Sequence, residues 1–155
     1  MTVPVSQAVV AMGGGHGLHA TLSALRTLHD SLDVDTITAV VTVADNGGSS
    51  GRLRQQFGVL PPGDLRMALA ALCGDDREGR QWADVLQSRF GGDGPLAGHA
   101  IGNLLIAGIW ERLGDPVSGL DMVGKLLGVQ GRVLPMAAVP LDIEADVIGV
   151  DPLHP

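Results

Sequence analysis

The sequence predicts an α/β fold with a mostly parallel sheet. Residues Gln7–Met12 and Ile37–Val43 are two short apolar runs rich in β-branched side chains, which is typical of strands buried on both faces. Between these runs, the leucines of Leu18–Leu28 recur at spacings of three and four residues, which predicts an amphipathic helix. A strand, a helix and a strand in this order predict a right-handed βαβ unit with parallel strands.

The rest of the chain combines one long connection with further regular elements. Residues 44–64 are polar and rich in Gly, Ser and Pro, and a connection of this length indicates a functional loop. Apolar spacing near helical periodicity predicts four helices, at Asp64–Leu72, Gly79–Phe90, Ala100–Leu113 and Val117–Leu127. Two more strands are expected at Arg132–Met136 and Leu141–Val150. So few strands for so many helices suggest the front part of a longer protein, or a sheet that a partner covers.

Composition indicates a single globular domain over residues 1–155, because 45% of the chain is apolar and 17% is charged. The net charge of −7 and the scarcity of aromatic side chains argue against nucleic-acid binding, which needs a basic face and stacking platforms. The single cysteine, Cys73, excludes an intramolecular disulfide and is expected to be a small buried hydrophobe.

The apolar runs are too short to span a membrane, and the first residues lack the pattern of a signal peptide. We therefore expect no membrane contact and a cytoplasmic location.

Glycine clusters in three windows, residues 13–17, 47–51 and 91–102, which hold twelve of the 23 glycines. Clustered glycine indicates backbone that approaches another group closely or adopts positive φ. The first window lies between a predicted strand and a predicted helix, where free amide groups bind phosphate. We predict that it contacts the ligand through Gly13, Gly14, Gly15, His16 and Gly17.

This first window matches neither of two common phosphate-binding motifs. Leu18 occupies the place of the third glycine of the dinucleotide fingerprint, and a Walker loop would need a following Gly-Lys-Ser or Gly-Lys-Thr. The alternative is a tight turn that binds nothing. His16 would then point into solvent instead of donating to an anion.

The second window lies in the polar segment Thr42–Arg54, which begins where the second predicted strand ends, at the ligand edge of a parallel sheet. This segment supplies a carboxylate, an amide, two hydroxyls, three glycines and two guanidinium groups, and so suits an anionic, hydroxylated ligand. The predicted ligand contacts are Asp45, Asn46, Gly47, Gly48, Ser49, Ser50 and Arg52. Asp45 is also the candidate ligand of Mg²⁺, or the partner of a ribose hydroxyl. A flexible solvated loop is the alternative.

Two further helix starts carry polar candidates. Asp64 lies at a natural N-cap position, so capping competes with chemistry there. Arg66 falls in the positive first turn of the same helix, where a cation is more plausible if it faces an anion. His99 and Asn103 share one face at the start of an apolar helix, and buried polar groups there need protein or ligand partners. Capping and close packing through Gly102 are the alternatives.

Together these segments resemble the CofD/YvcK family, and the resemblance covers essentially the whole chain. The segments that carry it are Gly13–Leu18, Thr42–Arg54, Pro61–Arg66 and Gly98–Leu105. The chain looks closest to actinobacterial members of the YvcK branch, the gluconeogenesis factors. The family likeness implies a Rossmann-like, three-layer α/β fold in a protein about twice this length, of which this chain is the N-terminal portion.

The resemblance also implies two functions. The YvcK branch binds UDP-sugars such as UDP-N-acetylglucosamine and supports cell-wall synthesis and cell shape. The CofD branch uses Mg²⁺ to transfer a phospholactyl group from a guanylylated donor to a deazaflavin precursor. Asp45 and Asp64 would be the catalytic candidates in that second case, with Asp45 at the metal.

We expect the first function, a nucleotide-sugar-binding regulator, and leave open whether the chain is an enzyme. Asn46 stands where the family often has a second aspartate. The loss of this negative charge argues against the interpretation as a metal-dependent transferase. Since the family's C-terminal ligand segment is absent here, association with a second copy is also plausible.

Overall fold

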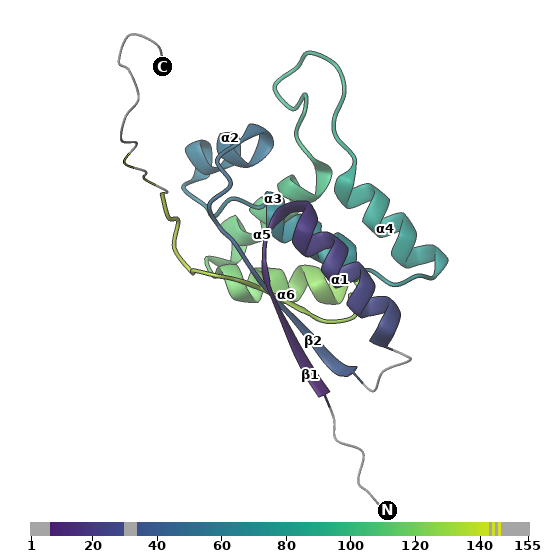
Figure 1. Ribbon diagram of the computed structural model, residues 1–155. Helices are drawn as coiled ribbons and strands as arrows, with labels where there is room; N and C mark the ends of the chain where they lie inside the picture. Colours follow the sequence, from purple (N-terminus) through teal and green to yellow (C-terminus); the bar gives the residue numbers. More distant parts are fainter. Residues whose placement is uncertain (1–6, 30–33, 143, 145, 147–155) are drawn as a thin grey trace, which may run out of the picture.

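The computed structural model describes residues 7–29, 34–142, 144 and 146. Its strands and helices follow one another in an α/β order (Figure 1). They are β1 (Gln7–Gly13), α1 (Gly15–His29), β2 (Val34–Val41), α2 (Gly48–Phe57), α3 (Gly63–Leu72), α4 (Arg77–Gln87), α5 (Ile101–Leu113), α6 (Pro116–Leu127) and β3 (Arg132–Pro135). The predicted α/β fold is confirmed.

The three described strands form one parallel sheet in the order β1-β2-β3. Helix α1 connects β1 to β2 as the crossover of the predicted βαβ unit, and five helices intervene before β3 returns to the other edge of β2. In register, Ala39 in β2 pairs with Ala11 in β1 and with Val133 in β3. The carboxyl ends of all three strands therefore meet at the same edge of the sheet.

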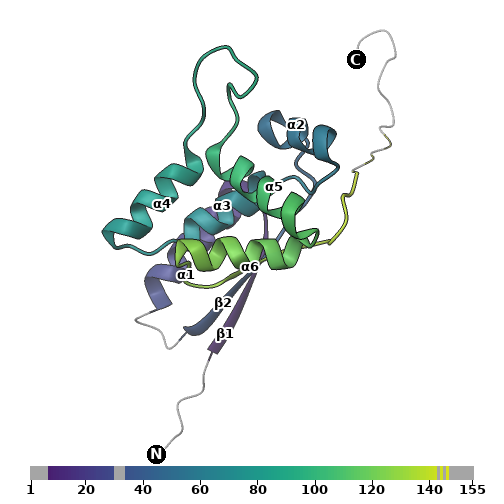
Figure 2. The ribbon, with the colours of Figure 1, turned by 180° about the vertical axis from the view of Figure 1, so that it is seen from behind.

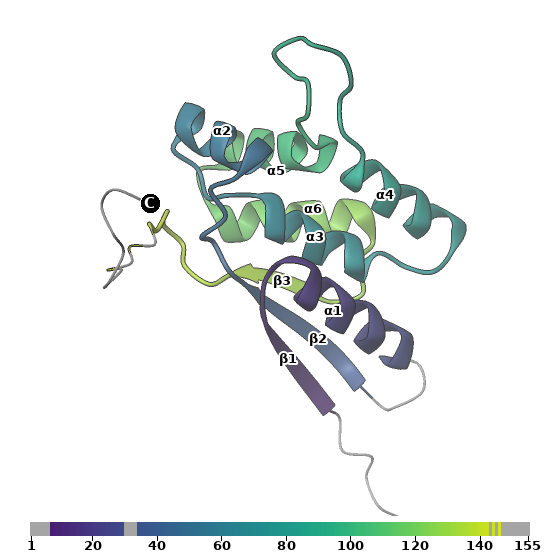
Figure 3. The ribbon, with the colours of Figure 1, turned by 45° about the horizontal axis from the view of Figure 1, so that its top comes forward.

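The helices lie on one face of this sheet (Figure 3). Helices α1, α3 and α6 contact the strands, and α2, α4 and α5 pack mainly against other helices, so the molecule has three layers with the sheet on the outside. Figure 2 shows α6 lying along α5. On the opposite face of β1, Val10 is 60% exposed and Met12 is 69% exposed.

The prediction that Gln7–Met12 is buried on both faces is therefore wrong for the described part of the chain. β-Branched, apolar composition does not distinguish a strand covered on two faces from one covered on one face. What decides coverage is the side of the sheet on which the helices return, and the described helices all return on the same side.

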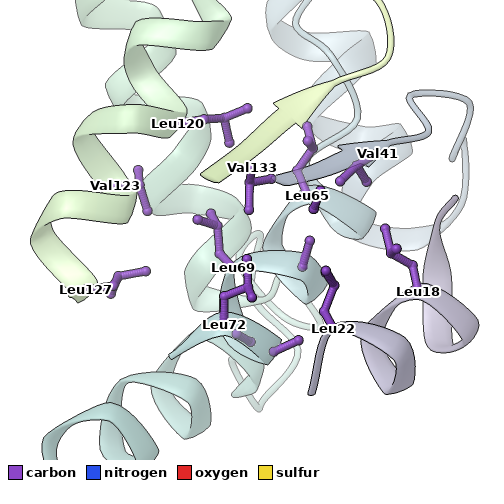
Figure 4. Close-up of a cluster of buried hydrophobic side chains, with 14 of the residues drawn as sticks. Leu18, Leu22, Val41, Leu65, Leu69, Leu72, Leu120, Val123, Leu127 and Val133 are labelled. Carbon is purple, nitrogen blue, oxygen red and sulfur yellow. The ribbon is translucent and has the colours of Figure 1, made fainter. Parts of the chain in front are cut away.

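The hydrophobic core lies between this sheet and the helices (Figure 4). Leu22 from α1, Leu69 from α3 and Val123 from α6 converge on Val41 and Val133 of the strands, with almost no exposed surface. Each fully buried leucine stabilises the fold by about 1.5–3 kcal/mol relative to an exposed one. Helix α3 is buried along most of its length and forms the centre of the domain. Cys73, which follows it, is buried as predicted.

Several predicted boundaries are corrected. The connection 44–64 contains the unpredicted helix α2, whose apolar residues are too few to give a periodic pattern. Helix α1 begins at Gly15 rather than at Leu18, and α4 ends at Gln87 instead of Phe90 because Arg89 pairs with Ala100 in an antiparallel bridge.

Within the predicted strand Leu141–Val150, residues 141, 142, 144 and 146 have no regular structure, and its other residues lie outside the described part of the chain. None of the helices described is long and apolar enough to cross a membrane.

Candidate functional site

A polar cavity lies beyond the carboxyl end of β2, where the N-terminal ends of α2 and α3 meet. Its volume is about 270 Å³, and we call it the acidic cavity because two carboxylates line it. The lining residues are Asp45, Gly47, Gly48, Ser49, Ser50, Gly63, Asp64, Arg66, Met67, Arg89 and Asn103. Segments from four separate parts of the sequence thus contribute to one site.

Glycines allow these segments to approach one another closely. A Cβ atom at Gly14 would lie 2.1 Å from Thr42 Oγ1 and 2.3 Å from Asp64 Oδ2. A Cβ atom at Gly63 would lie 2.5 Å from Asp45 Oδ2 and from Ser50 Oγ. Real Cβ atoms do not come this close, so a side chain at either position would displace these polar groups of the site.

The two carboxylates of the acidic cavity have hydrogen-bonding partners but no cation. Asp45 accepts a hydrogen bond of 3.0 Å from the Gly47 amide, and Asp64 accepts one of 2.9 Å from the Thr42 hydroxyl. Neither forms an ion pair with any described residue. Asp64 does not cap α3, because the N-cap position belongs to Pro62 and Asp64 lies within the first turn.

Arg66 is a buried cation whose partners are neutral. It is 5% exposed; its Nε donates a 3.0 Å hydrogen bond to Asn103 Oδ1, and its Nη1 donates to Gln87 Oε1. Within the described chain, no carboxylate reaches ion-pair distance of it. Burial lowers the pKa of Arg66 and the neighbouring Arg89 lowers it further, while Asp45 and Asp64 act in the opposite direction. A buried guanidinium without a counter-ion favours an incoming anion.

A chain of buried hydrogen bonds extends from Arg66 away from the cavity. Asn103 Nδ2 donates to Ser49 Oγ at 3.0 Å, and Ser49 Oγ lies 2.9 Å from His99 Nδ1. All four side chains are buried. Burial, followed by the positive charges of Arg52 and Arg89, lowers the pKa of His99. This histidine is therefore held in its neutral form near pH 7.

A second cavity of about 310 Å³ adjoins the first and shares Arg66, Met67 and Arg89 with it. Its remaining lining residues are His16, His19 and Gln87. We call it the basic cavity, since four of its six lining residues are arginine or histidine and none is acidic. Burial, His16, Arg26 and Arg66 all lower the pKa of His19, in that order of importance. The two cavities thus form one cleft with a carboxylate end and a cationic end.

The cleft brings most of the predicted site residues together. The acidic cavity contains Asp45, Gly47, Gly48, Ser49, Ser50, Asp64, Arg66 and Asn103, and the basic cavity contains His16. Other predicted residues do not line either cavity: Gly13, Gly14, Gly15, Gly17, Asn46, Arg52 and His99. Of these, Gly14 and His99 support lining residues from behind, and Arg52 donates to the Ala97 carbonyl at 2.8 Å.

Sequence reasoning predicted His16 and Arg66 at the cationic end but missed its other lining residues. Arg89 was expected inside a helix, but it follows α4 and donates to the Gly98 carbonyl at 2.8 Å. His19, Met67 and Gln87 lie on helices, where sequence spacing alone does not show which cavity a side chain faces. The only available signal was the position of Arg89 just before a glycine window.

The acidic cavity also fits the predicted Mg²⁺ ion. Magnesium is commonly bound by one or two carboxylates together with the phosphates of a substrate, and Asp45 and Asp64 would supply the carboxylates here. The described residues contain no group of three or more His, Cys, Asp or Glu side chains that could hold a metal ion. A magnesium ion in this cavity would therefore depend on a phosphate ligand as well as on the protein.

Comparison with known proteins identifies the family. Residues 9–151 match the family model described as 2-phospho-L-lactate transferase CofD. The chain belongs to the CofD family. It is 62% identical over 147 residues to a Mycobacterium tuberculosis protein named "Putative gluconeogenesis factor", and 40% identical over 139 residues to the gluconeogenesis factor of Listeria innocua. These matches cover 95% and 90% of the chain but 42% and 41% of the two relatives.

A solved structure supports the fold of this CofD-family chain. Protein BH3568 from Bacillus halodurans is 42% identical and superposes with a TM-score of 0.76, covering 87% of this chain and 40% of that one. A second crystal structure of BH3568 describes that protein as a member of the UPF0052 family. The gluconeogenesis-factor names of the relatives support the YvcK type within the CofD family.

Proposed function

We propose that this CofD-family chain is a cytoplasmic, nucleotide-sugar-binding regulatory protein of the gluconeogenesis-factor type, with a ligand of the UDP-N-acetylglucosamine class. The observation that carries the proposal is Arg66, a buried guanidinium that lines two cavities and whose side-chain partners among the described residues are the neutral Asn103 and Gln87. A diphosphate would supply the missing negative charge. A role in cell-wall synthesis and cell shape is part of the same proposal.

The two ends of the cleft suit the two halves of such a ligand. The diphosphate would lie against Arg66 and Arg89, with Ser49 and the first amides of α2 as hydrogen-bond donors. The hydroxyl groups of the sugar would donate to the carboxylates of Asp45 and Asp64. A cleft with cations at one end and acceptors at the other thus binds an anion that also carries hydroxyls.

Calorimetric titration of the purified protein with UDP-N-acetylglucosamine tests this proposal. We expect saturable heat and a raised melting temperature, with much weaker effects for uridine, which lacks the diphosphate. Absence of both heat and thermal shift at millimolar ligand would refute nucleotide-sugar binding.

The alternative function is a Mg²⁺-dependent phospholactyl transferase, and the pair Asp45 and Asp64 in one cavity favours it. Both carboxylates would hold the ion, which stabilises negative charge on a transferring phosphate. Incubation with a guanylylated donor and a deazaflavin precursor would then give Mg²⁺-dependent product, lost in Asp45→Ala. The gluconeogenesis-factor names of the relatives make the regulator the preferred proposal.

A further inference from the structure

The hydroxyl group of Ser49, which lines the acidic cavity, contacts two side chains. Whether this hydroxyl donates or accepts in each contact depends on those side chains. Its hydroxyl oxygen accepts from Asn103 Nδ2 and lies against His99 Nδ1. The direction of the Asn103 contact is set by Arg66, because a guanidinium only donates and therefore holds the Asn103 oxygen. The amide nitrogen of Asn103 must then face Ser49 as a donor.

His99 decides what Ser49 offers to a ligand. A hydroxyl has one hydrogen and two acceptor positions, and Asn103 occupies one acceptor position. If Nδ1 of His99 carries no hydrogen, Ser49 donates to it and presents only a lone pair to the cavity. If Nδ1 carries a hydrogen, Ser49 accepts from both neighbours and its own O–H points toward the cavity. Only the second arrangement can donate to a phosphate oxygen.

The charges around His99 favour a neutral ring in the free protein. The first arrangement is the neutral tautomer that carries its single hydrogen on Nε2, and we assign this tautomer to the free protein. Arg52 from α2 and Arg89 from the segment after α4 are the charged groups that act on the ring, and both repel a proton. None of the described carboxylates forms an ion pair with it. A bound anion beside Ser49 and Arg89 would offset these positive charges and favour a protonated ring.

We propose that His99 is a positioning residue for the anionic ligand: protonation of its ring turns the Ser49 hydroxyl toward the cavity, so that the ligand and a proton bind together. This inference rests on the proposed function for the identity of its ligand. It assigns His99 a part in binding although its side chain does not line either cavity.

The first test compares the affinity for UDP-N-acetylglucosamine at pH 7.5 and pH 5.5 in the wild-type protein and in His99→Asn. The diphosphate of this ligand lacks the second ionisation that a phosphate monoester has near pH 6, so its own charge stays constant. Wild-type affinity should rise by up to about tenfold for each pH unit between the pKa of His99 in the ligand-bound protein and its lower pKa in the free protein. Asn places an amide near the position of Nδ1 but does not titrate, so the dependence should flatten.

The histidines of the basic cavity provide the matched control. In the double variant His16→Asn/His19→Asn, the affinity for UDP-N-acetylglucosamine should still be higher at pH 5.5 than at pH 7.5, because His99 is unchanged. If His99→Asn keeps the full wild-type pH dependence of affinity, the proposal is wrong.

The second test needs no variant and therefore does not depend on how a variant folds. Nitrogen NMR of the histidine rings reports which ring nitrogens carry hydrogen. At pH 6.5, we expect Nδ1 of His99 to be unprotonated in the free protein and protonated when UDP-N-acetylglucosamine is bound. An unchanged ring on ligand saturation overturns the inference.

A failure of the proposed function can be told apart from a failure of this inference. If UDP-N-acetylglucosamine does not bind at any pH, the proposed function fails, and sulfate then serves as the probe anion. Sulfate should raise the pKa of His99 relative to a chloride control of equal ionic strength. An identical His99 titration in both salts would reject the coupling itself.

Discussion

The guanidinium of Arg66 contacts two side-chain amides instead of a carboxylate. Its removal should therefore affect ligand affinity more than the free energy of unfolding. Buried ion pairs are difficult to remove because the remaining charge is left without its partner. Removing Arg66 leaves only the neutral Asn103 and Gln87, whose amides can reorient toward each other or toward water.

We therefore expect Arg66→Met to keep its fold, with the free energy of unfolding changed by less than about 2 kcal/mol. Its affinity for UDP-N-acetylglucosamine should fall at least about tenfold, which corresponds to about 1.4 kcal/mol. Chemical denaturation and calorimetry measure the two effects. Arg132→Met, which removes an exposed arginine outside the cleft, is the control and should bind normally.

Gly14 and Gly17 lie in the same glycine window but face different surroundings. A Cβ at Gly14 would overlap Thr42 and Asp64, whereas one at Gly17 would meet no atom within 4 Å. We expect Gly14→Ala to lower the free energy of unfolding by about 1–3 kcal/mol and to weaken ligand binding by displacing Asp64. Gly17→Ala should be neutral or stabilising by up to about 1 kcal/mol, because alanine favours the helix. Equal unfolding midpoints for the two variants would contradict this assignment.

At the scale of single residues, the sequence predicted identities better than roles. Asp64 was predicted at the site and lines the acidic cavity, and capping was an open alternative until the structure showed its hydrogen bond with Thr42, 22 positions earlier. Arg89 was missed because its place just before a glycine window does not show that its side chain lines the same cavities as Arg66. Long-range partners of this kind depend on the packing of helices, which residue spacing does not encode.

Helix α5 combines a glycine that its neighbours require with one that they do not. A Cβ at Gly102 would lie 2.8 Å from Leu86 Cδ2 and 2.9 Å from Arg66 Cγ, whereas Gly108 has no atom within 4 Å of that position. The structure therefore agrees with the alternative of close packing through Gly102, whereas Gly108 makes no such close contact.

Alanine at these two positions of α5 should have opposite effects. Gly102→Ala should destabilise the protein by about 1–3 kcal/mol and shift Arg66, so that ligand affinity also falls. Gly108→Ala should raise the melting temperature, since alanine is favoured over glycine in an exposed helix by about 0.5–1 kcal/mol. Thermal unfolding with and without UDP-N-acetylglucosamine checks both; a destabilised Gly108→Ala would show that the helix environment is misassigned.

At the scale of elements, apolar periodicity predicted the helices that pack against the hydrophobic core. The apolar stripes of α1, α3, α5 and α6 face the core and were recognisable from spacing. Helix α2 was missed because its buried residues are Ser49, Ser50, Gly51 and Leu53, which do not form an apolar stripe. The end of α4 was misplaced because a backbone bridge to Ala100 competes with the helix there.

For the whole molecule, two histidines link stability to pH. Burial and neighbouring positive charges lower the pKa of His19 and of His99 in the folded state. Between the folded and unfolded pKa values, the unfolded chain binds more protons, so stability rises with pH and is lost as the pH falls below about 6.5.

We expect the free energy of unfolding to decrease as the pH is lowered from 7.5 to 5, because His19 and His99 take up protons more readily in the unfolded chain. The double variant His19→Gln/His99→Asn should show a shallower decrease, measured by urea denaturation at each pH. A variant that is as pH-sensitive as the wild type would place the titrating groups elsewhere. The pH dependence of binding has the opposite sign, because the ligand favours the protonated ring.

The close contacts around Gly14, Gly63 and Gly102, together with the exposed face of β1, predict an unusual distribution of tolerated substitutions along the chain. In most domains a saturation-mutagenesis profile shows permissive loops and intolerant strands. Here Gly14, between β1 and α1, and Gly63 and Gly102, in the first turns of α3 and α5, should reject nearly every substitution, while the strand positions of Val10 and Met12 should accept polar ones. A sequence that appears to be rich in flexible linkers would thus have its least replaceable residues in those same segments.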